Sequence, residues 1–125
     1  GLLASVGLAA FTRAQTRGRD AKRIADLAGV RSALELYYAE NSNYINTANA
    51  WVNASTLGAL VPTFIKVLPS DPKTGWSAYR YRSVNSGTPS TAQGYCLAAN
   101  REVGAASTTC TVTRETNYDY SIGNP

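Results

Sequence analysis

The sequence predicts an α+β fold in which a long N-terminal helix packs on a small antiparallel sheet of three or four strands. Two patterns lead to this prediction. Residues 1–41 contain no proline and carry apolar side chains at helical spacing, whereas from Ala78 onward residues alternate with the period of two expected of a strand. With 125 residues, the chain is long enough for one domain with a modest core.

One continuous helix is expected from Leu2 to Asn41. Between residues 13 and 41 it is amphipathic, with large apolar side chains three or four positions apart, which places them on one face. This face is expected to pack on the sheet and consists of Ile24, Leu27, Val30, Leu34 and Tyr37. The polar run Asn41-Ser42-Asn43 is expected to end the helix, because these side chains compete for backbone hydrogen bonds.

The helix starts with an uncharged, mostly apolar segment, residues 1–12. As a helix, this segment covers roughly 18 Å, against roughly 30 Å for the hydrocarbon core of a bilayer. We therefore expect it to be the end of a longer apolar segment, which lies in a membrane or against the same segment of neighbouring copies. Its large side chains are Leu2, Leu3, Val6, Leu8 and Phe11. Without residues 1–23 the rest of the chain is expected to fold as a soluble monomer.

A basic cluster follows the apolar segment. Residues 13–23 hold five basic residues and one acid, Asp20, and so contain much of the chain's excess of 12 − 8 = 4 positive charges. Next to a membrane, such side chains contact anionic headgroups or extend their charged ends into water. Nucleic acid is a further possible partner, but DNA binding is not predicted, because aromatic and cationic residues interleave too little. The cluster consists of Arg13, Arg17, Arg19, Lys22 and Arg23.

The globular head is expected to comprise residues 42–125. A connecting segment, residues 42–77, contains a short helix from Ser55 to Val61. The sheet follows over residues 78–113, and residues 114–125 form a tail or a last edge strand. Its first two strands are expected to pack on the helix through Tyr79, Tyr81, Tyr95 and Leu97. A third, weaker strand is expected from Thr109 to Thr113.

The chain has two cysteines, Cys96 and Cys110. An even pair in a small chain rich in Ser, Thr, Asn and Tyr predicts a disulfide and an oxidising compartment. Two unrelated buried thiols are the alternative. We expect the disulfide to close the hairpin between the second and third strands and to hold the weakly apolar C-terminal region.

The residue types offer little for catalysis. The chain has no histidine, which is the commonest general base and a common metal ligand. We predict no catalytic residue, cofactor or metal site, and we do not expect an enzyme. Asp71, Glu102 and Asp119 are the only candidate calcium ligands that we considered, and they are disfavoured because calcium requires six or more oxygens.

Several segments of the chain are characteristic in combination. They are Gly1–Val6, Ala14-Gln15, Arg19–Leu27, Leu34–Tyr38 with Tyr44, Leu60–Ile65, Leu68–Pro72 and Tyr79–Tyr81. Together they resemble a bacterial type IV pilin or pseudopilin. The resemblance covers most of the chain, is strongest over residues 1–38 and 60–81, and is weak after residue 100. It implies a helix whose first part is a membrane anchor before assembly and the filament core afterwards.

The resemblance implies a structural subunit of a cell-surface filament that supports adhesion, twitching motility or DNA uptake. The partners would be identical subunits, the cytoplasmic membrane before assembly, and the pilus assembly machinery. Two alternatives are a pseudopilin of a type II secretion system and a membrane-tethered DNA-binding minor pilin. Gly1 is expected to lie about a dozen residues inside the mature protein, so the leader peptide and the processed N-terminus match no residue of this sequence.

Overall fold

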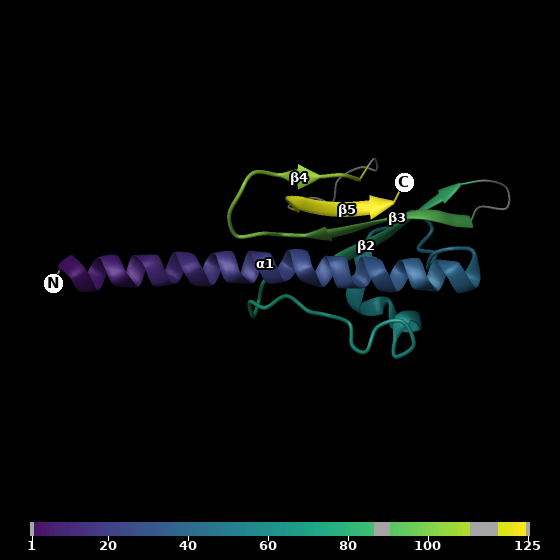
Figure 1. The fold of residues 1–125 in the computed structure, drawn as a ribbon. Helices are drawn as coiled ribbons and strands as arrows, with labels where there is room; N and C mark the ends of the chain where they lie inside the picture. The colour runs from purple at the N-terminus through teal and green to yellow at the C-terminus, as the bar shows by residue number, and fades with distance from the viewer. Residues whose placement is uncertain (1, 87–90, 111–117, 125) are drawn as a thin grey trace.

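The computed structural model describes residues 2–86, 91–110 and 118–124, and Figure 1 shows how they are arranged. One long helix, α1 (Leu2–Asn41), packs on a five-stranded sheet, so the predicted α+β class and the predicted helix are confirmed. The strands are β1 (Val52–Asn53), β2 (Arg80–Ser86), β3 (Thr91–Ala99), β4 (Ser107–Thr108) and β5 (Tyr120–Asn124).

The sheet is mixed, which corrects the expectation of a purely antiparallel sheet of three or four strands. The strand order is β1-β2-β3-β5-β4, and β4 pairs with β5 in parallel while the other pairs are antiparallel. The reason is the position of β5, which comes from the predicted tail and lies between β3 and β4. Of the third predicted strand, Thr109–Thr113, residues 109 and 110 follow β4, which ends at Thr108, and are not in a strand; residues 111–113 lie outside the described part of the chain.

The hydrophobic core lies where α1 meets the sheet and the connecting segment. Figure 1 shows the sheet on one side of α1 and the connecting segment on the other. Leu27, Val30 and Leu34 of the helix are fully buried there, and they share one cluster with the following side chains. These are Tyr79, Tyr81, Tyr95 and Leu97 of the sheet region, and Leu57 and Leu60 of the connecting segment.

Ile24 corrects the predicted buried face of α1, because it is 38% exposed. The helical period of 3.6 residues explains the error. Leu27, Val30 and Leu34 lie 4, 7 and 11 residues after Arg23, close to whole numbers of turns, whereas Val30 lies 6 residues after Ile24. The buried face therefore continues through Arg23 and Asp20, both of which are buried.

One expectation for the connecting segment also changes. The helix expected from Ser55 to Val61 is a pair of short 3-10 turns, Ala54–Thr56 and Gly58–Leu60. Tyr37 is half-buried, packs against the core cluster, and also lies edge-on against Phe64 of the connecting segment, with 5.6 Å between ring centroids. Tyr37 thus helps to hold this segment on the helix.

Candidate functional site

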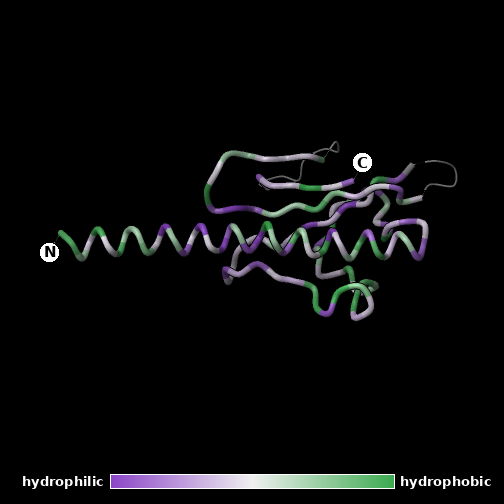
Figure 2. Tube along the Cα trace, viewed as in Figure 1, coloured by the Kyte–Doolittle hydropathy of each residue, from purple (hydrophilic) through white to green (hydrophobic). Residues whose placement is uncertain are grey.

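The first part of α1 is an exposed apolar surface. Leu2, Leu3 and Phe11 are 87%, 91% and 60% exposed, and Val6 and Leu8 are similarly uncovered. Figure 2 shows this end of the helix extending beyond the head, without the strongly hydrophilic residues that follow it. Burying a large apolar side chain gains about 1.5–3 kcal/mol, and a contiguous exposed patch of such side chains marks an interaction site.

Within the described residues, α1 does not contain an apolar stretch long enough to cross a membrane.

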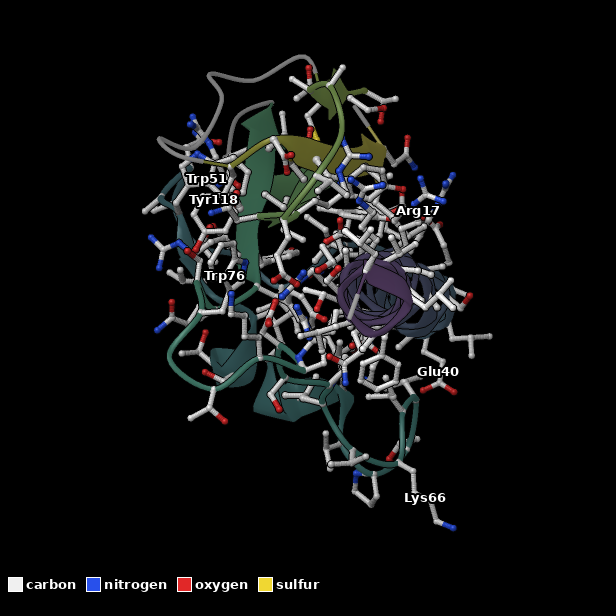
Figure 3. All side chains as sticks on the ribbon, turned by 90° about the vertical axis from the view of Figure 1, so that its left-hand side faces the viewer. Arg17, Glu40, Trp51, Lys66, Trp76 and Tyr118 are labelled. Atoms are coloured by element: carbon white, nitrogen blue, oxygen red, sulfur yellow. A yellow bond between two sulfur atoms is a disulfide. The ribbon has the colours of Figure 1, made fainter. Side chains whose placement is uncertain are left out.

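The structure divides the five residues of the basic cluster into three exposed side chains and two that form ion pairs with acids of the head. Arg13 and Arg17 are exposed and have no ion-pair partner within residues 2–86, 91–110 and 118–124. Figure 3, viewed along α1, shows Arg17 beside the helix at the edge of the molecule, on the side away from the connecting segment. Lys22 forms an exposed ion pair with Asp26, 2.8 Å between Nζ and Oδ2, one turn further along the helix.

Arg23 forms the centre of a buried charge cluster and is 0% exposed. Its Nε and Nη2 donate to the two carboxylate oxygens of Asp71, at 2.6 and 2.8 Å. Its Nη1 donates to Asp20 at 2.7 Å and to Glu102 at 2.8 Å. The expected headgroup contact of Arg23 is therefore wrong, because the fold brings acids 48 and 79 residues away onto its side chain.

Two further cations complete the cluster. Arg19 donates to both carboxylate oxygens of Glu102, at 2.6 and 2.8 Å, and Lys73 donates to the same carboxylate at 3.1 Å. The cluster thus contains three cations and three carboxylates, a net charge of 3 − 3 = 0. Arg19 is consequently engaged within the subunit, which corrects its expected role as a headgroup contact.

The cluster joins three separate parts of the chain. Arg23 and Asp20 belong to α1, Asp71 to the connecting segment, and Glu102 to the turn after β3. Asp20 also accepts hydrogen bonds from the backbone N–H groups of Glu102 and Val103, at 2.8 and 3.0 Å. These contacts hold both loops against the helix near the point where α1 leaves the head.

The hydrogen bonds also favour the charged forms of Glu102 and Arg23. The bond from Arg19, followed by those from Arg23 and Lys73, lowers the pKa of Glu102 well below its ordinary value, although burial opposes this shift. The bonds to Asp71, Glu102 and Asp20 raise the pKa of Arg23. Both side chains are therefore charged at neutral pH.

The three calcium ligands that we considered do not form a metal site within the described residues. Asp71 and Glu102 bind arginine and lysine side chains, and Asp119 accepts a hydrogen bond from the backbone N–H of Arg101. Within the described residues, no three acidic, cysteine or histidine side chains form a group that could hold a metal ion.

The predicted disulfide between Cys96 and Cys110 is confirmed, with 5.8 Å between the Cα atoms. Its place differs from the expected hairpin, because Cys96 of β3 is paired with Gly123 of β5. The sulfur of Cys110 packs over Gly123, where an added Cβ would also overlap the carbonyl oxygen of Tyr95. The disulfide therefore crosses β5 at a position where only glycine fits.

No family model matches this chain, and neither a curated protein nor a solved structure was found to be similar to it.

The buried charge cluster is the feature that the sequence did not predict. Its partners are distant in sequence, so no local motif marks them. One signal was present: Asp20 and Arg23 continue the 3-4-3-4 spacing of Leu27, Val30 and Leu34. A charged pair on an apolar helical face requires partners of opposite charge, because an unpaired buried charge is very costly.

Proposed function

We propose that this protein is a structural subunit that polymerises into a helical filament of identical copies, as type IV pilins do. The observation that carries the proposal is the exposed apolar segment of α1, whose large side chains are 60–91% exposed in the single subunit. In a filament these side chains would be buried against the same segment of neighbouring copies. A contact between different surfaces, repeated with a rotation that does not close, produces a helical fibre.

Two further features support this proposal. The charge cluster fixes the head to α1, so a force on the helix would be passed to a rigid head. The disulfide is typical of proteins outside the cytoplasm, which fits a cell-surface filament with a pool of subunits in the cytoplasmic membrane. Before assembly, the apolar segment would be covered by lipid as part of a longer anchor.

Electron microscopy of a deletion strain, with and without the restored gene, tests the proposal. We expect surface fibres to disappear on deletion and to return with the gene, and fibres purified from the restored strain to contain this chain. Intact fibres with failed protein secretion would instead indicate a secretion pseudopilin. Intact fibres with failed DNA binding would indicate a DNA receptor.

A further inference from the structure

We propose that Asn53 carries an N-linked glycan, a carbohydrate attached through the side-chain amide nitrogen. Residues 53–55 are Asn-Ala-Ser, which fits the acceptor pattern Asn-X-Ser/Thr, where X is any residue except proline. In the whole sequence, no other asparagine fits this pattern. The modification requires a chain that leaves the cytoplasm, as the disulfide indicates, but it does not depend on the proposed filament.

Asn53 does not cap a helix, although asparagine commonly has this role at the start of a helical turn. An N-cap side chain accepts a hydrogen bond from a backbone N–H of the first turn. Asn53 precedes the 3-10 turn Ala54–Thr56, yet its side chain makes no capping bond. Its Oδ1 instead accepts a hydrogen bond from Nη1 of Arg80, at 2.7 Å. This bond fixes the amide group, and the nitrogen that would carry the carbohydrate has no acceptor within the described residues.

The backbone presents both side chains of the acceptor pattern to solvent. Asn53 ends β1 with extended backbone angles, φ −66° and ψ 135°, and the chain then turns. Asn53 and Ser55 are exposed, whereas Ala54 between them is buried in the core cluster. The N–H of Ala54 donates to the carbonyl oxygen of Tyr79 at 2.8 Å, which holds the turn on the sheet. The amide and the hydroxyl that a glycosyltransferase must reach therefore lie on the surface of the folded head.

The site also has room for a bulky group. The strand order β1-β2-β3-β5-β4 places β1 at an edge of the sheet, and among the described strands it pairs with β2 alone. Glycans are bulky and hydrated, so they are accommodated at surfaces and not within a packed layer. A carbohydrate on Asn53 would extend from this edge without displacing a neighbouring strand.

The attachment is a glycosyl transfer with a defined second substrate. The donor is an oligosaccharide joined through its anomeric carbon to a lipid-linked phosphate. The amide nitrogen of Asn53 forms a bond to that carbon, the bond from the carbon to the phosphate oxygen breaks, and the lipid phosphate leaves with the bonding electrons. The amide gives up one proton to a base of the transferase, so neither an oxidant nor a reductant is required. The hydroxyl of Ser55 does not react and serves in recognition.

Mass spectrometry of the full chain purified from its natural host tests the proposal. Trypsin cuts after Arg31 and Lys66, so one peptide, residues 32–66, contains the acceptor pattern. We expect this peptide to carry a carbohydrate mass, and fragmentation to locate it on Asn53. Ser55→Ala removes the hydroxyl and should abolish the added mass. Ser55→Thr is the matched control, because it keeps the hydroxyl and should retain the mass.

Asn53→Gln gives a second measurement. It keeps an amide oxygen for the bond from Arg80 but no longer fits the acceptor pattern, so it should also lose the carbohydrate. A wild-type peptide 32–66 that occurs only without added mass would overturn the proposal. Carbohydrate that persists on S55A or N53Q would overturn it as well, because the attachment would then lie on another residue.

These outcomes are separate from those that test the filament. Fibres built from an unmodified chain would leave the proposed function standing and show that the glycan is absent. A chain that carries the glycan on Asn53 but forms no fibres would confirm the modification and contradict the proposed function.

Discussion

At the scale of single residues, Arg23 shows how the fold tolerates a cation without solvent contact. Three carboxylates surround its guanidinium, and the planar group binds both oxygens of Asp71. Such a cluster need not add stability relative to apolar packing, but removal of one partner leaves charges buried without compensation. The sensitivity of the cluster to mutation is therefore greater than its net contribution to folding.

We predict that Arg23→Met lowers the free energy of unfolding by about 3–5 kcal/mol, because the carboxylate of Asp71 loses its main partner. Arg23→Lys keeps the charge but not the two-pronged bond, so its loss should be smaller. Urea unfolding followed by circular dichroism measures both variants. A methionine variant as stable as the wild type would show that the cluster is not needed to hold the head together.

Glu102 gives the cluster a defined pH dependence. Its pKa is lower in the folded protein than in the unfolded chain, so its ionisation stabilises the fold above the unfolded pKa. Stability should therefore fall as the pH drops below about 4.3, the ordinary pKa of glutamate, towards the lower folded pKa. The urea midpoint measured between pH 6 and pH 3 reports this loss.

The matched variant for this measurement is Glu102→Gln, which keeps the shape of the side chain but cannot ionise. It should be less stable than the wild type at pH 6, and its midpoint should fall less steeply towards pH 3. Parallel pH profiles for the two proteins would show that another carboxylate is responsible for the acid sensitivity.

At the scale of elements, the truncation of residues 1–23 that the sequence suggested would remove side chains of α1 that are buried in the head. Residues 2–12 are exposed, whereas Asp20 and Arg23 are buried in the head. We predict that removal of residues 1–12 leaves a soluble monomer with an unchanged urea midpoint. Removal of residues 1–23 should destabilise the head by several kcal/mol or prevent folding, because Asp71 and Glu102 then lose Arg19 and Arg23.

The disulfide stabilises the other end of the chain. Cys96 and Cys110 lie 14 residues apart, and a closed loop of about 15 residues contributes about 3 kcal/mol in the chain-entropy model. We predict that the double variant C96A/C110A loses about this amount in urea unfolding. Reduction of the wild-type protein should give a similar loss, and an unchanged midpoint in both experiments would show that the sheet holds this region unaided.

The sequence predicted those elements that have a long periodic pattern. Helix α1 has 40 residues, and β2 and β3 have seven and nine, enough for a periodicity to be recognised. Strands β1 and β4 have two residues each and carry no such pattern. The position of β5 between β3 and β4 depends on long-range pairing, so it could not be derived from residues 120–124 alone.

The same distinction applies to the candidate site: features that are local in sequence could be predicted, and those that depend on long-range contacts could not. The exposed apolar segment was predictable because it is continuous in sequence and uncharged. The partners of Arg23 were not, because Asp71 and Glu102 belong to loops whose positions depend on the finished fold. The disulfide was predictable because the chain has only two cysteines, although the strand that it crosses was not.

At the scale of the whole molecule, one helix serves two kinds of contact. From Arg19 onward it is held in its own head by the sheet, the connecting segment and the charge cluster. Residues 2–12 have no contact of this kind within the described structure and stand in solvent. The stability of the head and the stability of an assembly should therefore respond to different substitutions.

Val6 allows this separation to be tested. It is 68% exposed in the subunit, so Val6→Asn removes no contact within the head and should change its free energy of unfolding by no more than a surface substitution does, about 0.5 kcal/mol. In a filament the asparagine would be buried without a partner, at a cost of about 1–3 kcal/mol in every subunit. We therefore predict normal folding but a severe loss of filaments by electron microscopy. Leu34→Ala is the reciprocal variant: Leu34 is fully buried in the head, so its truncation should lower the free energy of unfolding by about 2–5 kcal/mol. If Val6→Asn filaments form normally, the exposed segment of α1 is not the assembly surface.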